Sequence, residues 1–220
     1  MNDFIFQNLS LEHTLAKDLF SETFYPHEAL SSLKNYVLKT AQKLDKTVYK
    51  EIREGIWIAK NATVSDSAYI CAPCIIGENT EIRHCAFIRG SVIIGNGCVV
   101  GNSTEIKNSI IFDSVQIPHY NYVGDSILGY GAHLGAGAIT SNVKSDKSAV
   151  TVCYGKEKIE TDRKKLGAII SDGVEVGCNS VLNPGTVIGK GSRIYPLSSV
   201  RGYVPPNSIY KKENAVSFIK

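Results

Sequence analysis

The chain has 220 residues, a formal net charge of +3 at pH 7 and 43% hydrophobic residues. This length is enough for one substantial domain with a small appendage, and so mild a charge gives no support for nucleic-acid binding. No apolar run approaches the ~18 residues of a membrane span, and the first residues lack the basic start and apolar stretch of a secretory signal. We therefore expect a cytoplasmic protein that binds neither nucleic acid nor membranes.

Residues 1–55 are predicted to be helical. Leu11, Leu15 and Leu19 recur every four residues, and hydrophobic residues keep the spacing of one helix face again after Pro26. Pro26 suits the first turn of a helix, where a missing N–H costs nothing. We predict two helices before Ile56.

From Ile58 onwards, hydrophobic residues stand six apart. The first run is unbroken and comprises Ile58, Val64, Ile70, Ile76, Ile82, Ile88, Ile94, Val100, Ile106 and Phe112. A second run comprises Ile170, Val176, Leu182, Ile188, Ile194 and Val200. A period of six fits neither an α-helix nor a two-faced strand, so it indicates short strands that each turn inward once. The pattern predicts an all-β, left-handed parallel β-helix of hexapeptide repeats over residues 56–204, in which three hexapeptides close one coil and coils stack at ~4.8 Å.

Both ends of such a solenoid need covering, because an open coil exposes strand edges and core. We expect the helices of residues 1–55 to be a small N-terminal cap or an oligomer contact. Residues 205–220, which begin with Pro205 and Pro206, are expected to form an extended closing tail.

The six-residue step slips after Phe112. Pro118 stands where an inward aliphatic residue is due, and the pattern resumes through Ile117 and Leu128, so the register loses a residue twice. Sequences break their own local rules most often at functional sites. His119 follows Pro118 directly, and we expect it at a distorted corner.

The repeat stops altogether after Asn142 and leaves an inserted arm at 143–166. The arm is rich in basic residues, namely Lys144, Lys147, Lys156, Lys158, Arg163, Lys164 and Lys165. An insertion this long in a compact solenoid is more often functional than idle.

Arg89 and Lys107 each follow an inward residue and are 18 residues apart, so they are expected to stack in neighbouring coils. Two such cations ~5 Å apart repel by roughly 1 to 3 kcal/mol, which favours an anion between them, and phosphate suits an arginine fork beside a lysine. Equally, both side chains could be solvated, or one could pair with Glu105.

The cysteines and histidines give little support for a metal site. Cys71, Cys74, His84 and Cys85 lie close in sequence, but zinc modules usually carry a second closely spaced pair. We therefore expect no metal.

Four stretches of the chain resemble one enzyme family. They are Ile88–Gly90, Gly101–Lys107, His119–Asp125 and Leu134–Asn142. The resemblance is to the acetyltransferase half of the bacterial bifunctional enzyme that makes UDP-N-acetylglucosamine, and it runs from about Ile56 to Tyr210. The end of the arm is similar to that of archaeal-type sugar nucleotidyltransferases with a β-helical tail. No glycine-rich nucleotide loop precedes the repeats, so uridylyl transfer is not expected.

The resemblance implies a homotrimer with active sites between subunits, and it assigns roles to nine residues. His119 would be the general base and Asn142 would orient the amine or the base. Arg89 and Lys107 would bind the phosphate of the sugar, and Tyr122 and Glu105 would bind the sugar itself. Ala136 would contact the thioester end of acetyl-CoA, and Lys147 would bind the phosphates of the coenzyme. His133 stands where the family has an amide that touches the sugar. An imidazole is well suited to deprotonate an ammonium during attack.

We therefore predict an acetyl-CoA-dependent N-acetyltransferase acting on glucosamine 1-phosphate or a similar amino sugar phosphate, for which a separate nucleotidyltransferase is a further candidate partner. The same fold also hosts non-catalytic functions, so a sugar-phosphate sensor or assembly module stays open. Zinc-dependent hydration through His84, His119 and His133 fits less well, because the spacing of these histidines does not match that chemistry.

Overall fold

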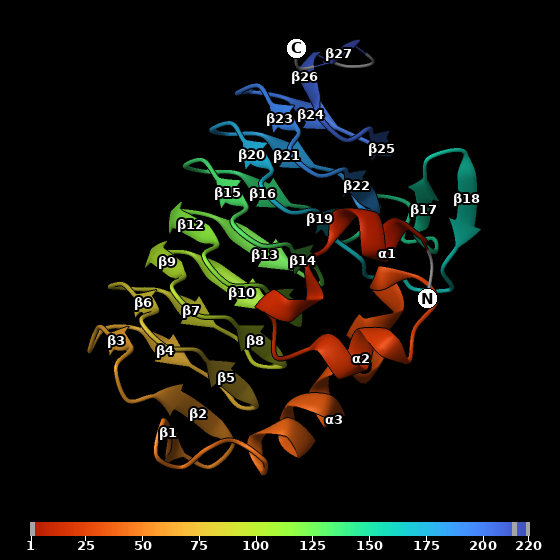
Figure 1. Cartoon of the computed structure of the whole chain (residues 1–220). Coiled ribbons are helices and arrows are strands. Elements are labelled where there is room, and N and C mark those ends of the chain that lie inside the picture. The colour runs from red at the N-terminus through yellow and green to blue at the C-terminus, as the bar shows by residue number, and fades with distance from the viewer. Residues whose placement is uncertain (1–2, 213–214, 219–220) are drawn as a thin grey trace.

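The computed structural model describes residues 3–212 and 215–218. Short strands wind into stacked triangular coils, and each side of the triangle forms one sheet (Figure 1). The pairing within each sheet is parallel except at the ends of the solenoid. The predicted left-handed parallel β-helix is thereby confirmed.

The strands of the solenoid are divided among three sheets, here named A, B and C. Sheet A contains β1 (Tyr49–Arg53), β2 (Ile56–Ala59), β5 (Cys74–Ile76), β8 (Val92–Ile94), β11 (Ser109–Ile111), β14 (Ile127–Leu128), β19 (Ala168–Ile170), β22 (Thr186–Ile188) and β25 (Tyr203–Val204). Sheet B contains β3 (Thr63–Val64), β6 (Glu81–Ile82), β9 (Val99–Asn102), β12 (Gln116–His119), β15 (His133–Leu134), β20 (Glu175–Val176), β23 (Arg193–Ile194), β26 (Ser208–Lys212) and β27 (Ala215–Phe218). Sheet C contains β4 (Tyr69–Ile70), β7 (Phe87–Ile88), β10 (Glu105–Lys107), β13 (Tyr122–Gly124), β16 (Ile139–Thr140), β21 (Val181–Leu182) and β24 (Ser199–Val200).

The six-residue step is the distance between successive inward positions. In sheet C, Ile88 pairs with Ile106 and Ile106 with Val123, and all three are completely buried. Each inward side chain therefore stacks on its counterpart in the next coil, which makes a continuous hydrophobic core along the solenoid.

The lost residues lie at the corner between sheets C and A, and not beside His119. Ile94 pairs with Ile111 and Ile111 with Leu128, so these coils take 17 residues instead of 18. Asn108 and Asp125 turn the corner with φ of +45° and +49°, in the left-handed region that Asn and Asp tolerate.

Two expectations about the slip are consequently wrong. The inward residue of β11 is Ile111, and Phe112 lies one place beyond it and packs against Phe20, with ring centroids 5.7 Å apart. His119 lies in a segment that keeps the six-residue step, from Ile117 to Val123.

The helical segment is α1 (Asp3–Asn8), α2 (Lys17–Ser21) and α3 (Ala29–Ala41), with 3-10 turns at Leu11–His13 and Pro26–Glu28. These helices do not cover an end of the solenoid, so the expected cap is wrong, while the alternative of an oligomer contact stays a prediction. They lie along sheet A, on the right in Figure 1, and α3 contacts β5, β8 and β11. Sheet A is buried on both faces as a result, and its outward residues Ile75, Ile93 and Ile110 are fully inaccessible. Among the described helices, none is long and apolar enough to cross a membrane.

The ends of the solenoid are covered by antiparallel strands. At one end β1 pairs with β2, and at the other β27 pairs with β26. The expected extended tail thus begins as one more strand of sheet B, in which Tyr210 is buried. Residues 213–214 and 219–220 of that tail lie outside the described residues.

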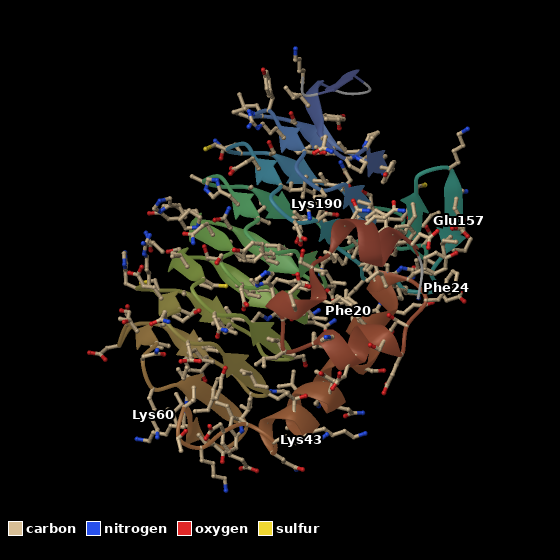
Figure 2. All side chains as sticks on the ribbon, viewed as in Figure 1. Phe20, Phe24, Lys43, Lys60, Glu157 and Lys190 are labelled. Atoms are coloured by element: carbon tan, nitrogen blue, oxygen red, sulfur yellow. The ribbon has the colours of Figure 1, made fainter. Side chains whose placement is uncertain are left out.

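The arm leaves and rejoins the solenoid at the corner between sheets C and A, where the N–H of Leu166 donates to the carbonyl of Asn142. Its tip is a hairpin of β17 (Thr151–Tyr154) and β18 (Glu157–Glu160). The buried Tyr154 hydroxyl lies 2.8 Å from His27 Nδ1, and Figure 2 shows Glu157 on the same side of the molecule as Phe24. The arm is therefore anchored to the N-terminal helices.

Candidate functional site

A network of polar side chains lies on the outward face of sheet C, where β10 and β13 run into the corner with sheet A. Arg89 Nη1 donates to Glu105 Oε1 at 2.8 Å, and Lys107 Nζ donates to Asp125 Oδ2 at 3.0 Å. The stacking expected of Arg89 beside Lys107 follows from the pairing of Ile88 with Ile106.

The repulsion between these two cations is relieved within the chain, because each cation has its own carboxylate. The alternative in which one of them pairs with Glu105 therefore holds for Arg89. The hydrogen bond to Glu105 raises the pKa of Arg89 above its ordinary value, so this guanidinium is always charged. Arg89 and Glu105 are both partly open to solvent. An incoming phosphate would therefore compete with Glu105 for Arg89.

Asp125 is the centre of the network. It is 3% exposed, and its carboxylate accepts hydrogen bonds from Lys107, from Asn108 Nδ2 at 2.8 Å and from Asn142 Nδ2 at 2.6 Å. Asn142 Nδ2 also lies 3.2 Å from Tyr122 Oη. One buried carboxylate thus fixes both a cation and the amide predicted to orient the amine.

Tyr122 lies flat against its own strand. A Cβ atom at Gly124 would be 2.5 Å from Tyr122 Oη, so the ring can adopt this position only because residue 124 is glycine. Burial raises the pKa of Tyr122, and the negative charges of Asp125 and Glu105 raise it further. The phenol therefore stays protonated and can donate a hydrogen bond to a ligand.

His119 is the last residue of β12 and lies at the corner between sheets B and C, three residues before Tyr122, which begins β13. Gly137 N–H donates to the carbonyl of His119 at 3.0 Å, which places Ala136 in the next coil at the same corner. Buried Asn121 links the two coils, since its Oδ1 accepts from His119 N–H at 3.0 Å and its Nδ2 donates to Gly135 O at 2.8 Å. The His119 ring is exposed and has no hydrogen-bond partner in the described part of the chain, so a ring nitrogen is available to accept a proton.

Two predicted residues lie away from this network. His133 faces outward on sheet B, where its Nδ1 lies 2.7 Å from Glu175 Oε2, so it does not join the sheet C cluster. Lys147 lies in an exposed turn, and the shallow groove of about 290 Å³ beside that turn is lined instead by Lys144 and Arg201.

The sequence analysis did not single out Asp125 and Asn108. The 18-residue spacing alone would not have found Asp125, because this coil is 17 residues long: Lys107 pairs with Gly124, and Asp125 lies one place beyond it, in the turn to sheet A.

The comparisons with known proteins cover the part of the chain that holds this network. The family described as the GMPPB C-terminal domain matches residues 70–160. A bifunctional sugar-1-phosphate nucleotidylyltransferase/acetyltransferase of Sulfurisphaera tokodaii is 34% identical over 161 residues, which are 73% of this chain and 40% of that protein. The bifunctional protein GlmU of Methanococcus maripaludis is 32% identical over 217 residues, 96% of this chain and 52% of that protein. This chain contains a domain similar to the acetyltransferase half of GlmU.

The chain spans about half or less of the length of these two relatives. Among solved structures, a mutant of AntD, an N-acyltransferase from Bacillus cereus in complex with dTDP and coenzyme A, has a TM-score of 0.41. It is 20% identical and the match covers 74% of this chain and 82% of that one. No group of three or more histidine, cysteine or acidic residues that could hold a metal occurs among the described residues.

Proposed function

We propose that this protein is an acetyl-CoA-dependent N-acetyltransferase of an amino sugar phosphate, with glucosamine 1-phosphate as the substrate to test first. The observation that carries the proposal is the placement of two features at the two ends of β13. At the corner of sheets B and C, His119 offers an imidazole that has no hydrogen-bond partner among the described residues, one coil before Ala136. Asp125 and Asn142 lie at the other end of β13, at the corner of sheets C and A, and Tyr122 Oη lies 3.2 Å from Asn142 Nδ2. The resemblance to GlmU-type proteins supports the same chemistry.

Each residue then has a defined task. The phosphate of the sugar would lie at Arg89 and Lys107, and Tyr122 would donate a hydrogen bond to the sugar. Asn142, held by Asp125, would orient the amine. His119 would accept the proton of the amine as its nitrogen attacks the thioester carbonyl carbon, where a C–N bond forms and the C–S bond breaks. The thiolate of coenzyme A leaves and takes up a proton. Acetyl-CoA is a co-substrate in this scheme, and its thioester end would lie at Ala136.

The remaining expectations belong to the same proposal. A homotrimer would complete each site with a neighbouring subunit, and exposed Tyr120 and Leu197 at the corner of sheets B and C would be available for that contact. A separate nucleotidyltransferase would use the acetylated product. Lys147 remains a candidate for the coenzyme phosphates, together with Lys144 and Arg201. The location would be the cytoplasm, where acetyl-CoA is available.

The test is a thiol-release assay with acetyl-CoA and glucosamine 1-phosphate. We expect turnover by the unaltered protein, and a loss of about 100-fold or more in kcat for His119→Ala, because general-base catalysis contributes 10²–10⁴-fold. His84→Ala is the matched control, since His84 lies at the same corner two coils earlier, and it should keep full activity. Binding of the sugar phosphate without turnover would favour the sensor function over the enzyme.

A further inference from the structure

The outward face of sheet C continues beyond the polar network as an aromatic surface. We define the aromatic platform as Tyr69 of β4 and Phe87 of β7. Tyr69 pairs with Phe87, Phe87 with Glu105 and Glu105 with Tyr122, so all four side chains form one column on the sheet. The two platform rings are 5.9 Å apart at 55°, and they are 60% and 37% exposed.

Positive charge borders the platform. Arg89 follows Phe87 by two residues on the same face of the sheet, and Lys107 lies beside it in the next coil. On the far side, the guanidinium of Arg53 lies 5.9 Å from the centroid of the Tyr69 ring. Exposed aromatic rings beside cations are the combination that binds nucleotides, because bases stack on the rings and phosphates pair with the cations.

The order of these groups along the solenoid matches the order of groups in one class of molecule. Tyr122 is two strands from Phe87 and three from Tyr69, which is ~10 Å and ~14 Å at the strand spacing of ~4.8 Å. Lys107 lies on β10, between Tyr122 and Phe87, and Arg89 directly follows β7, the strand that carries Phe87. A sugar at Tyr122 would thus be followed by phosphates at Lys107 and Arg89, with a flat apolar group on the platform beside Arg89.

We infer that the site takes a nucleoside diphosphate amino sugar in preference to the sugar 1-phosphate, with the nucleobase stacked on Phe87 and Tyr69. This inference rests on the proposed acetyl transfer and names its substrate class. The C–N bond that forms is the same for both substrates, because the same amino group attacks the same thioester. A stacking surface does not distinguish one base from another, so the class is defined by the diphosphate and the base together.

The experiment compares kcat/KM for UDP-glucosamine and glucosamine 1-phosphate, both with acetyl-CoA in the thiol-release assay. We expect the unaltered protein to prefer UDP-glucosamine by about tenfold or more, the size of one stacked base. Phe87→Ala should remove that preference by lowering kcat/KM for UDP-glucosamine about tenfold, while glucosamine 1-phosphate changes less than about twofold. Phe87→Tyr keeps a ring and should keep the preference. Phe24→Ala, which removes an exposed ring on the far helical segment, should change neither.

Four results would overturn the inference. Equal kcat/KM for the two substrates means that the base makes no contact, while the proposed function stands. An equal loss with both substrates in Phe87→Ala means that the ring acts on the site as a whole. A change in molecular mass by light scattering in that variant, with the substrate preference intact, assigns the platform to a contact between copies of the chain. If neither substrate is acetylated, the proposed function itself fails and the inference with it.

Discussion

Replacing Asp125 by asparagine tests whether one buried carboxylate organises the site. Asparagine has the same shape, but it carries no charge and one of its two polar atoms is a donor. The carboxylate now serves Lys107, Asn108 and Asn142. In the variant, one of these donors loses its acceptor and Lys107 loses its counter-charge.

The cost follows from the burial of the pair. Removing one partner of a fully buried ion pair costs about 3–5 kcal/mol. The Lys107 side chain is 24% exposed and can turn to water, so we expect the free energy of unfolding to fall by about 2–3 kcal/mol. At about 2–4 °C per kcal/mol for a chain of this size, Tm falls by roughly 4–12 °C. Because Asn142 also loses its anchor, kcat should fall by about 10- to 100-fold.

A matched control separates stability from catalysis. Asp172 lies at the corner between sheets A and B and is as buried as Asp125. It accepts hydrogen bonds from the Ser10 hydroxyl at 2.6 Å and from Tyr130 N–H at 2.8 Å, and Lys190 Nζ lies 3.6 Å away. Asp172→Asn should lower Tm by a similar amount and leave kcat within about twofold, since hydrogen-bond losses are comparable. The measurements are thermal unfolding and thiol release. An unchanged kcat in Asp125→Asn, or an equal fall in kcat in both variants, would refute this role for Asp125.

Two further predictions concern stability. Burial lowers the pKa of His27 from 6.5 to about 4, so only the unfolded chain binds this proton between those pH values, and the free energy of unfolding should fall by about 2 kcal/mol from pH 7 to pH 5. Urea unfolding measures this free energy at the two pH values, and in His27→Gln its fall from pH 7 to pH 5 should be smaller by about 2 kcal/mol. An equal fall in both proteins would contradict the assignment. A Cβ at Gly101 would lie 1.5 Å from the Pro118 carbonyl oxygen. A Cβ at Gly173 would meet no atom within 4 Å, so the only cost there is the backbone strain of a non-glycine residue at φ +61°. Gly101→Ala should therefore lower Tm more than Gly173→Ala, whose cost is about 1–2 kcal/mol, and the reverse order would show that the coils adjust freely there.

The repeat could be predicted from the sequence because its period depends on one local property, namely that every sixth side chain faces the core. Ile88, Ile106 and Val123 stack as that period requires. The same spacing placed Arg89 beside Lys107 correctly. It could not show that each cation has a carboxylate, because Asp125 reaches the network only through the tight turn that shortens its coil.

The helical segment shows the limit of local patterns. Spacing of leucines predicted helices, and helices are present, although they are shorter and more numerous than expected and β1 follows them. Amphipathic spacing says that one face is buried, but not against what. The second buried face of sheet A, which carries Ile75, Ile93 and Ile110, is visible only once the coils are stacked.

The sequence by itself determined the solenoid, its six-residue step and the segments that carry His119, Arg89, Lys107 and Tyr122, because these depend on a periodic pattern of inward side chains. The tertiary structure decided which of those side chains meet. Asp125 binds Asn142 and Lys107 because three coils bring residues 17 or 18 apart to one corner, while His133 turns to Glu175 on another face. Contacts between coils depend on register and corner geometry, and a shift of one residue at Asn108 moves every later side chain relative to its neighbours.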